Sequence, residues 1–474
     1  MRITFQLRFH THFGQSLWLS GNHEILGNGS VEGALPLQFL DLETWQVIFI
    51  IPQGAVPDVD ITYHYFLREL DGTIWPDWGD DRVINFSAFA VRELLVIDAW
   101  NPPGFYENAF YTEPFKQVLL RANQTEVRVS SPAKVNHVFK AKAPLLEKGQ
   151  TLCLLGSAPV LGGWNTSQPV LLNRLEGQDF LTAGLELSQQ AFPLSYKYGV
   201  FDLERKAFVR YEDGSDRILH NSLASGKQTI VNDGFARLPS TTWKGAGVAI
   251  PVFSLRTEQS FGVGEFTDLK GLVDWCRRTG LKLIQILPVN DTTATHSWMD
   301  SYPYAAISAF ALHPLYLNLS QVADAQNQVL LEALEEERKR LNALDSLEYD
   351  AVLQAKLAFI RQIFPLQKEK IPKSRDYQRF FEANRQWLAP YAAFCYLRDE
   401  FGTPDYTQWP AHHRYDPAAI AALTAENSPA FEEISLTYFV QYHLHLQLKE
   451  ATAHAHSRGL VVKGDIAIGV SRHR

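Results

Sequence analysis

Cysteines are the residues of this chain that could most readily form a metal or redox site, but their spacing fits neither. Cys153, Cys276 and Cys395 each lie in apolar or aromatic surroundings, far apart in the sequence. No metal-ligand or redox pair has such spacings, so we expect buried free thiols and no bound metal. An odd number of cysteines also fits a reducing compartment better than a disulfide-bonded exterior.

Four histidines form a second candidate for metal binding. They occur in pairs spaced by two, on what the pattern predicts to be one long helix: His443, His445, His454 and His456. Residues two apart on a helix do not share a face, as two metal ligands would. We therefore expect ordinary helix residues.

A glycine-rich segment offers a candidate for phosphate binding. Gly262-Val263-Gly264 begins like a dinucleotide-binding loop, but Thr267 stands where that pattern requires its third glycine. The charge run from Glu335 to Arg340 is expected to be a solvated helix face. These residues give no reason to expect a cofactor.

Length and charge limit the classes of protein that remain. At about 150 residues per domain, 474 residues suggest about three domains. The 52 acidic residues exceed the 44 basic ones, which argues against a nucleic-acid partner. No stretch approaches the about 18 consecutive apolar residues of a membrane span, and Met1 to Gln15 lacks the apolar core of a secretory signal. A soluble, cytoplasmic protein without a membrane partner is expected.

The first half of the chain contains a repeat. Gly14 to Gly21 recurs as Gly149 to Gly156, 135 residues further on. Three more pairs follow at this offset or at 133 residues: Leu26-Gly27 with Leu161-Gly162, Asp81-Arg82 with Asp216-Arg217, and Tyr63-His64-Tyr65 with Tyr196-Lys197-Tyr198. A repeat of this length indicates two tandem domains and not a solenoid.

The sequence pattern predicts that each copy is an all-β domain. Ile3, Phe5, Leu7 and Phe9 alternate with polar residues, as do the residues from Val135 to Ala141. Such alternation predicts strands with one buried face. Short apolar runs between Gly, Asn, Asp and Pro clusters continue through both copies, for example at 44–52 and 60–67. The pattern is typical of a β-sandwich of about 100 residues.

Both copies resemble the starch-binding domains of carbohydrate-binding module family 20. Their best-matched motifs are Leu161-Gly162-Gly163-Trp164, Tyr196-Lys197-Tyr198 and the segment from Tyr211 to Arg217. The resemblance implies immunoglobulin-like sandwiches at 1–100 and 133–235, with linkers at 101–132 and 236–246.

The same resemblance implies a sugar site made of Trp164, Lys197 and Tyr211. A glucose ring packs its C–H face on an aromatic ring, and a lysine at the edge binds its hydroxyl groups. The alternative, that the rings are sandwich core, is weakened because Trp164 lies in a turn-rich segment.

The first copy departs from this motif. Gly29 stands in the place of Trp164 and His64 in that of Lys197, while Trp75 is expected at the position of Tyr211, with Trp78 nearby. The first copy is therefore either a weaker glucan binder, one that uses Trp75 and Trp78 differently, or a structural domain.

The second half begins with a strand, helix and strand. Gly247 to Leu255 is an apolar run broken by Pro251, a helix is expected between Thr267 as cap and Gly280, and Leu281 to Val289 is a nearly continuous apolar strand. This order predicts a βαβ unit. Residues 321–450 are expected to be helical, with 331–344 and 434–456 as long helices.

The run from Gly247 to Leu319 resembles the 4-α-glucanotransferases of glycoside hydrolase family 77, in the branch with two starch-binding domains. Five segments carry the likeness: Pro251 to Leu255, Phe261 to Phe266, Gln285 to Pro288, Ser301 to Tyr304 and Ser308 to Leu315. The resemblance implies the first part of an α/β (β/α)8 barrel at 247–474, with a helical insertion at about 321–450.

This second resemblance also implies sugar-lining residues and a reaction. Tyr304, with Asp300 nearby, and Asp465 at the end of the strand expected at 460–470 would line the donor sites. The enzymes transfer α-1,4-glucosyl units, here from maltose or maltodextrin to glycogen or a starch-like glucan. They retain configuration by double displacement, which needs two carboxylates about 5 to 5.5 Å apart.

The family places its catalytic carboxylates in later segments, including an Arg-Ile-Asp-His context, and these 474 residues contain no such segments. We therefore expect an incomplete gene product, inactive by itself and with no catalytic residue of its own. The alternative is a non-catalytic α-glucan-binding protein, or a relic of the enzyme. A reading frame that continues past Arg474 would favour the enzyme. The sequence leaves monomer and dimer open.

Overall fold

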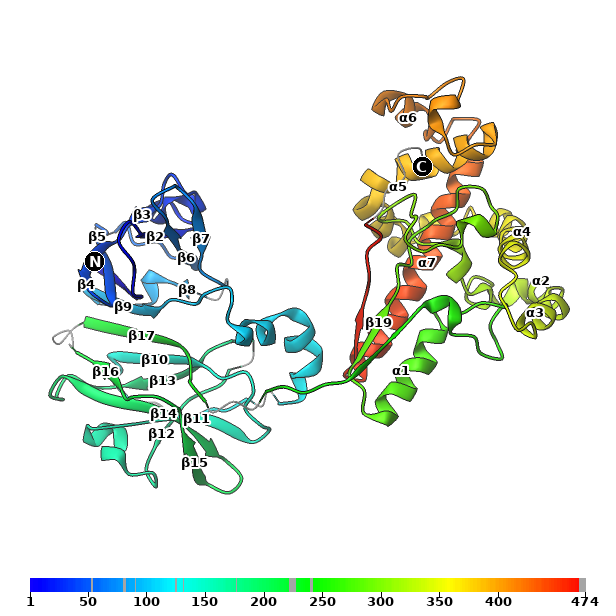
Figure 1. Ribbon diagram of the computed structural model, residues 1–474. Helices are drawn as coiled ribbons and strands as arrows, with labels where there is room; N and C mark the ends of the chain where they lie inside the picture. Colours follow the sequence, from blue (N-terminus) through cyan, green and yellow to red (C-terminus); the bar gives the residue numbers. More distant parts are fainter. Residues whose placement is uncertain are drawn as a thin grey trace. The chain divides into compact units, whose positions relative to one another are not determined.

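The computed structural model divides the chain into two compact units, Met1–Trp243 and Lys244–Arg474 (Figure 1). It describes residues 1–52, 54–79, 82–89, 91–123, 126–130, 132–175, 177–220, 227–238 and 242–468. Asp81 of the repeated Asp-Arg pair lies outside these residues. So do residues 469 and 470 of the last expected strand and parts of both expected linkers.

The first sandwich has the predicted alternating strands. Its large-sheet strands are β1 (Arg2–Arg8), β4 (Gln38–Asp41), β5 (Thr44–Ile50) and β9 (Glu93–Ala99). The small sheet consists of β2 (Ser16–Gly21), β3 (Leu35–Pro36), β6 (Ile61–Arg68), β7 (Ile74–Pro76) and β8 (Val83–Ile84). Ile3, Phe5 and Leu7 are fully buried, which confirms the predicted face of β1.

The second sandwich repeats this plan. Its large-sheet strands are β10 (His137–Lys142), β13 (Leu181–Leu185) and β17 (Lys227–Phe235). The small sheet consists of β11 (Gln150–Gly156), β12 (Val170–Leu171), β14 (Leu194–Asp202), β15 (Ala207–Tyr211) and β16 (Arg217–Leu219). Both copies also contain a short turn of helix after the second strand, η1 (Glu24–Gly29) and η6 (Pro159–Trp164).

The two sandwiches share one large sheet, which the sequence did not indicate. Seven strands follow in the order β13-β10-β17-β9-β1-β5-β4, with β9 of the first copy paired to β17 of the second. The segment expected as the first linker is folded into η3 (Tyr106–Tyr111), η4 (Pro114–Leu119) and η5 (Arg121–Asn123). Phe110, Val118 and Leu120 of this segment are buried.

The second unit contains the predicted strand, helix and strand. β18 (Gly247–Ile250), β19 (Leu283–Ile286) and β20 (Val461–Lys463) form a parallel sheet in the order β18-β19-β20, with α1 (Asp268–Thr279) after β18. β19 is shorter than the apolar run 281–289.

The predicted end of α1 is confirmed, but its predicted cap is wrong. Gly280 ends the helix with φ 82°, a left-handed conformation that glycine adopts without strain. The Thr267 side chain makes no capping hydrogen bond. Instead, the Asp268 carboxylate accepts a hydrogen bond from the Glu265 backbone N–H at 2.8 Å.

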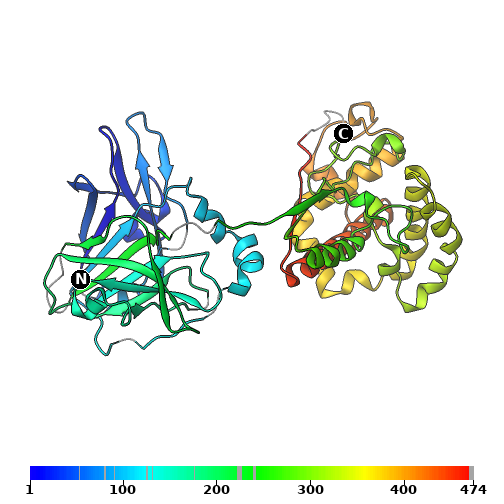
Figure 2. The ribbon, with the colours of Figure 1, turned by 60° about the horizontal axis from the view of Figure 1, so that its bottom comes forward.

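Six α-helices lie between residues 328 and 457, in agreement with the helical region predicted at 321–450 (Figure 2). They are α2 (Gln328–Glu332), α3 (Glu335–Asn342), α4 (Tyr349–Gln367), α5 (Arg375–Phe401), α6 (Pro417–Leu423) and α7 (Phe431–Ser457). The single-turn helices in this part of the chain are η8 (Trp298–Asp300), η9 (Pro314–Tyr316), η10 (Leu319–Gln321), η11 (Ala325–Asn327), η12 (Ile371–Lys373) and η13 (Tyr406–Gln408). Two others lie elsewhere, η2 (Phe86–Ala88) in the first sandwich and η7 (Val252–Ser254) after β18.

The long helix predicted at 434–456 is confirmed as α7, but the one at 331–344 is interrupted between α2 and α3. Leu334, between them, has φ −95° and ψ −6°, within the right-handed helical region but far from the regular α-helix values of about −63° and −42°. The charge run in α3 forms ion pairs at i,i+3, such as Arg340 with Glu337 at 2.7 Å, and is solvated as predicted. Only Leu341 of α3 is buried, so little apolar surface is available to stabilise one continuous helix.

A buried ion pair anchors α4 to the segment before α1. Lys356 of α4 contacts Glu265 at 2.6 Å and donates to the backbone oxygens of Leu315 and Leu317 at 2.7 and 2.8 Å. Asn318 donates to the other Glu265 carboxylate oxygen at 2.6 Å. The Glu265 of the glycine-rich segment thus has a structural role.

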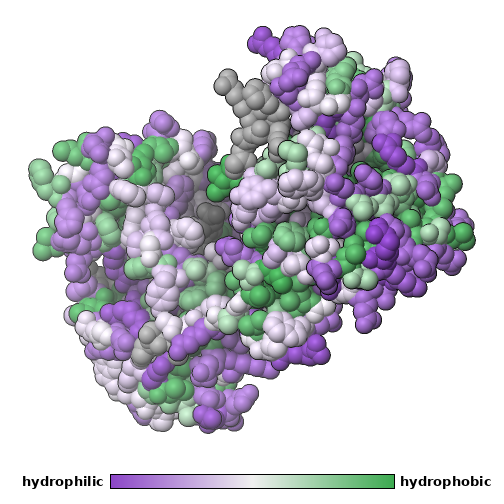
Figure 3. Space-filling view, turned by 45° about the vertical axis from the view of Figure 1, so that its right-hand side comes forward, coloured by the Kyte–Doolittle hydropathy of each residue, from purple (hydrophilic) through white to green (hydrophobic). Residues whose placement is uncertain are grey.

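On the face drawn in Figure 3, hydrophilic and hydrophobic residues are interspersed. Among the described residues, no helix has the length and apolar character needed to cross a bilayer.

Candidate functional site

Trp164 lies at the end of η6, half-buried, in an unusual backbone conformation. Its φ is 64°, in the left-handed region that residues with a side chain rarely adopt. The fold maintains this strain at a residue that presents a large aromatic ring. Strained residues of this kind cluster at binding sites, so the conformation points to a functional role.

Tyr211 faces Trp164 across the outer side of the small sheet. The ring centroids are 6.4 Å apart, with an interplanar angle of 65°. Tyr211 pairs with Gly199 of β14 and packs on Phe208 at 4.6 Å. A Cβ on Gly199 would lie 2.5 Å from the Phe208 ring, so the glycine makes room for this aromatic pair. Burial, and then the nearby Cys153 and Asp216, raise the pKa of Tyr211.

Lys197 shares this outer side, because it lies two residues before Gly199 on β14. Its Nζ donates to the Gly214 carbonyl at 2.6 Å and lies 3.8 Å from Asp216. The predicted residues Trp164, Lys197 and Tyr211 are therefore all partly exposed, and the alternative of sandwich core is excluded for them.

Glu212 fixes the strand that carries Tyr211. It is buried and accepts hydrogen bonds from the Tyr198 and Arg237 backbone N–H groups at 3.0 and 2.9 Å. Arg217 binds both of its carboxylate oxygens at 2.8 Å. Burial alone would raise the pKa of Glu212, but hydrogen bonds and the charge of Arg217 hold it below its ordinary value.

The first sandwich confirms two of the predicted equivalences. Gly29 ends η1 with φ 73°, close to the φ of Trp164, and so supplies the same turn without a ring. His64 pairs with Ser20, as Lys197 pairs with Leu155.

The strand register corrects the third equivalence. Phe66 stands in the place of Gly199, and it pairs with Pro76. Pro76 and not Trp75 therefore occupies the position of Tyr211. Trp75 pairs with Leu67, a residue of the core side, although its own side chain is exposed, as is that of Trp78.

Trp18 is an aromatic residue on the outer side of the first sandwich that sequence reasoning missed. It pairs with Phe66, and their rings are stacked with centroids 6.2 Å apart and planes 5° apart. The Arg68 guanidinium lies 4.7 Å from the Trp18 ring centroid. The repeated Gly-Gln-Ser-Leu-Trp segment, in which Trp18 stands in the place of Cys153, could have indicated it.

In the second unit, Tyr304 and Asp465 come together although they lie far apart in the sequence. The Tyr304 hydroxyl donates to Asp465 at 2.8 Å, and this hydrogen bond raises the pKa of Tyr304. Asp465 follows β20, so it lies beyond the carboxyl end of a parallel strand, where α/β folds bind ligands. The exposed Tyr302 ring lies 5.7 Å from that of Tyr304.

Asp300 does not join this pair at the surface. It is fully buried, and its carboxylate accepts from the Thr295 backbone N–H at 2.7 Å and from the Thr295 hydroxyl at 3.2 Å. The carboxylate is engaged within its own loop, so a role in shaping the loop fits its contacts better than the predicted contact with sugar.

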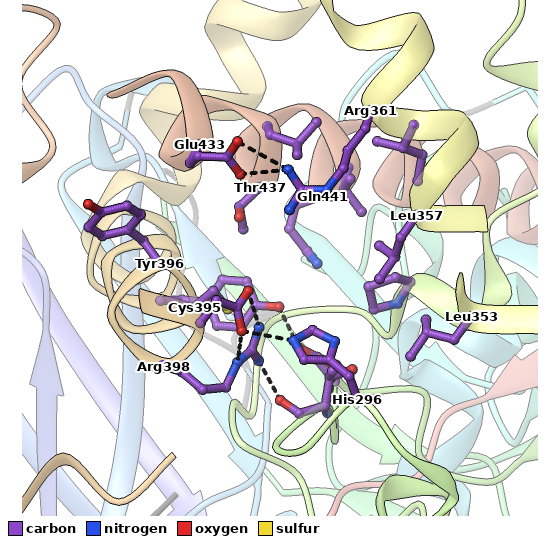
Figure 4. Close-up of a pocket in the computed structure, with 18 of the residues that line it drawn as sticks. His296, Leu353, Leu357, Arg361, Cys395, Tyr396, Arg398, Glu433, Thr437 and Gln441 are labelled. Atoms are coloured by element: carbon purple, nitrogen blue, oxygen red, sulfur yellow. Dashed lines mark hydrogen bonds and ion pairs between the residues drawn. The ribbon is translucent and has the colours of Figure 1, made fainter. Parts of the chain in front are cut away.

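A cavity of about 340 Å³ lies in the helical part of this unit (Figure 4). Arg361 binds Glu433 at 2.9 Å on one side, and Asp399 binds Arg398 and His296 at 2.7 and 2.8 Å on the other. Neither Tyr304 nor Asp465 lines the cavity, so it is separate from the residues expected to line sugar sites.

The three cysteines are buried, as predicted, and the four histidines lie on the single helix α7, as predicted. All three cysteines are buried free thiols. No group of three or more histidine, cysteine, aspartate or glutamate residues suited to a metal occurs in the described part of the chain. His443 is buried in α7, where burial lowers its pKa to about 4, and His454 contacts Asp274 at 3.0 Å.

The geometry defines a class: a protein with two β-sandwiches, the second of which presents two aromatic rings and a lysine on its outer side, followed by an α/β unit. The starch-binding domain family matches residues 1–91 and 134–230, and the 4-alpha-glucanotransferase family matches residues 250–473. The chain therefore carries two domains of the starch-binding family, followed by a region that matches glycoside hydrolase family 77, the family of the 4-alpha-glucanotransferases.

Individual relatives agree with this assignment. The chain is 33% identical to the 4-alpha-glucanotransferase DPE2 of Oryza sativa subsp. japonica over 99% of its own length, and it covers 50% of that protein. A 4-alpha-glucanotransferase of Chlamydia muridarum is 32% identical over 48% of this chain, which covers 41% of that protein. The chain thus spans half or less of these relatives.

Among solved structures, the amylomaltase from Streptococcus agalactiae in complex with acarbose has a TM-score of 0.40 and 21% identity. The match covers 49% of this chain and 45% of that one.

Proposed function

We propose that this chain supplies the glucan-binding and sugar-lining parts of a 4-α-glucanotransferase that moves α-1,4-linked glucosyl units between glucans. The observation that carries the proposal is the match of residues 250–473 to that enzyme family directly after two starch-binding domains. In this proposal the parallel strands β18, β19 and β20 belong to a (β/α)8 barrel, with α2 to α7 as its helical insertion.

The second sandwich holds the polymer on Trp164 and Tyr211, and Lys197 donates hydrogen bonds to sugar hydroxyl groups. Tyr304 and Asp465 line the donor site at the carboxyl end of the sheet. As a hydrogen-bonded pair they offer a phenol and a carboxylate, groups that bind sugar hydroxyls. Maltose or maltodextrin is the proposed donor, and glycogen or a starch-like glucan the proposed acceptor.

Transfer with retention requires a nucleophilic carboxylate and a second carboxyl group as acid and base. The family resemblance assigns both to segments that these 474 residues do not contain. The polypeptide 1–474 is therefore proposed to bind glucan without transferring glucose by itself.

Incubation of this polypeptide with maltose and glycogen, followed by measurement of released glucose, tests that assignment. We expect glucose at the level of a control without protein, because removing groups that act as a unit lowers the rate by several powers of ten. Turnover above that level would mean that carboxylates such as Asp465 perform the chemistry themselves.

A second experiment tests the donor site against the alternative of a purely glucan-binding protein. In a Trp18→Ala/Trp164→Ala/Tyr211→Ala background, which removes the outer-side rings of both sandwiches, maltotriose binding is followed by NMR. We expect residual binding that Tyr304→Phe weakens, with Tyr302→Phe as the matched control. Absence of residual binding would favour a protein that binds glucan only through its sandwiches.

A further inference from the structure

The two sandwiches are joined by main-chain pairing as well as by the connecting segment. β9 of the first copy and β17 of the second run parallel and pair from Glu93 opposite Lys227 to Asp98 opposite Asn232 (Figure 1). An ion pair of 2.5 Å between Lys227 and Glu93 lies at the first of these pairs. The joint, called the seam below, consists of β9, β17 and their side-chain contacts.

Each copy also contributes side chains to the core of the other. Leu95 and Ile97 of β9 pack in the core of the second sandwich, and Ile230 of β17 packs in the core of the first. Separation of the sandwiches would expose these apolar side chains to water, at about 25 cal/mol for each Å² of apolar surface. The seam therefore resists opening.

Buried polar residues near the seam follow the repeat. In the first copy, Asp98 accepts from the Tyr63 and Tyr65 hydroxyls at 3.1 and 2.7 Å. In the second copy, Asp233 accepts from the Tyr196 and Tyr198 hydroxyls at 3.0 and 2.8 Å. Each aspartate is fully or almost fully buried, so its partners determine whether it stabilises the fold.

Two residues cross the seam to these aspartates. Arg8 of the first copy binds Asp233 of the second at 2.7 Å, and Asn232 of the second donates to Asp98 of the first at 3.0 Å. The residue of the first copy that corresponds to Asn232 is Ile97, which has no such group. The crossing contacts are thus a feature of the joint and not of either domain.

The shared sheet separates the two small sheets. Along β9, Leu94 and Val96 face the first core, whereas Leu95 and Ile97 face the second. Successive side chains of a strand point to opposite faces, so the two cores cover opposite faces of the shared sheet. The outer sides of the two small sheets therefore point away from each other.

Both outer sides present aromatic rings. On the second sandwich these are Trp164 and Tyr211. On the first, the half-buried Trp18 ring is parallel to the buried Phe66 ring, and the Arg68 guanidinium lies 4.7 Å from the Trp18 centroid, so a ring and a hydrogen-bond donor occur in a different arrangement. A sugar needs a ring and a donor at its edge, and Arg68 can supply the donor.

We propose that the tandem sandwiches form one rigid body that holds two separate α-glucan chains, one on Trp164 and Tyr211 and one on Trp18. This inference rests on the proposed glucan binding of the second sandwich. Because the two outer sides point apart, a short maltooligosaccharide cannot occupy both. A polysaccharide with many chains can, and it gains affinity by bivalent binding at a fixed spacing.

Binding measurements on the full chain test the two sites. Calorimetric titration with β-cyclodextrin is expected to show two sites in the wild type and one in Trp18→Ala and in Trp164→Ala. Retardation by glycogen in gel electrophoresis should weaken at least ten-fold in either variant. Arg68→Ala, which leaves the stacked rings in place, checks that a Trp18 effect is not a folding defect and should weaken the same site.

The outcomes distinguish bivalent binding by both sandwiches from glucan binding by the second sandwich alone. Unchanged cyclodextrin stoichiometry and glycogen retardation in both Trp18→Ala and Arg68→Ala would overturn the bivalent body and leave glucan binding by the second sandwich intact. Unchanged binding in Trp164→Ala would instead contradict the proposed function.

The rigidity of the tandem sandwiches is tested by pulsed electron paramagnetic resonance. It measures the distance between spin labels at the exposed positions Asp71→Cys and Lys206→Cys, one in each sandwich. The native cysteines are buried and should not be labelled. We expect one narrow distance distribution, broadened in Arg8→Met/Asn232→Ile, which removes both crossing contacts. A broad distribution without these seam substitutions would overturn the rigid body.

Discussion

At the residue scale, the cluster of Trp164, Lys197 and Tyr211, the proposed sugar site, could be predicted because these residues lie in local motifs. Trp164 and Lys197 occupy positions that the turn and the strand alternation determine, and the structure places Tyr211 6.4 Å from Trp164 between ring centroids. The first copy was harder, because the register of β7 against β6 depends on pairing that local patterns do not reveal. The structure therefore has Pro76, and not the predicted Trp75, at the position equivalent to Tyr211. The sequence patterns also did not identify Trp18.

Lys197 can be tested without disturbing either ring. Lys197→Met keeps an apolar stem but removes the donor, so we expect β-cyclodextrin affinity to fall about ten-fold, since a hydrogen bond from a charged group contributes about 1.5 kcal/mol or more. The exposed Lys148→Met serves as the control. Equal affinities of the two variants in calorimetry would show that Lys197 does not contact sugar.

His137 predicts an acid-sensitive second sandwich. Burial lowers its pKa to about 4, from an ordinary value near 6.5, so the folded state favours neutral histidine. The contribution of neutral His137 to the free energy of unfolding is complete above about pH 6.5. It is lost as the pH falls towards 4, by up to about 1.4 kcal/mol per pH unit. His137→Ile, which introduces the residue of the first copy at this position, Ile3, should reduce the fall in unfolding temperature between pH 7 and 5.

The exposed His456→Ala is the control for that measurement and should retain the wild-type pH dependence. If His137→Ile also retained it, the acid sensitivity would arise elsewhere, with the buried His443 the next residue to test.

At the element scale, the predictions for α1 and α7 were accurate because each helix has a clear apolar pattern and α1 a glycine end. The break between α2 and α3 was not predicted, since their packing depends on distant residues such as those around Leu341. The same limit explains the segment 101–132, read as a linker, whose buried Phe110 and Val118 find partners only in the folded unit.

The ion pair of Lys356 with Glu265 is an element-scale contact whose loss should be severe. Lys356→Met leaves the Glu265 carboxylate buried without its cation, which should lower the free energy of unfolding by about 3 to 5 kcal/mol in denaturant titration. Lys368→Met, which breaks an exposed pair with Glu432 near the end of α4, should cost about 1 kcal/mol or less. Recovery of stability in Glu265→Gln/Lys356→Met would confirm that the unpaired buried carboxylate causes the loss. Similar losses of stability in Lys356→Met and Lys368→Met would contradict it.

At the scale of the whole molecule, the linker predicted at 236–246 includes the boundary between the two units, whereas the sheet shared by the two sandwiches lay beyond sequence reasoning. The repeat predicted two sandwiches, but pairing of β9 with β17 joins residues more than 130 positions apart. The pattern of side chains predicts that a segment is a strand, but it does not identify the strand with which that segment pairs. Only the apolar character of Leu95 and Ile97, on the side of β9 away from the first core, hinted that another element covers it.

The two units should unfold separately, because each has its own core. Calorimetry should show two transitions, and β-cyclodextrin at about 100 times its dissociation constant should raise the one belonging to residues 1–243, by about 2.7 kcal/mol in free energy for each occupied site. Equal shifts of both transitions, or a third transition within residues 1–243, would contradict this division.

Glucan binding through Trp164 is the central claim, and titration of the full chain with β-cyclodextrin tests it most directly. Loss of a stacked ring removes about 0.5 to 1.5 kcal/mol beyond area burial, so Trp164→Ala should weaken binding at this site at least several-fold. Trp275→Ala, which removes an exposed tryptophan of α1 in the other unit, should leave affinity unchanged. Wild-type affinity and stoichiometry in Trp164→Ala would contradict the account.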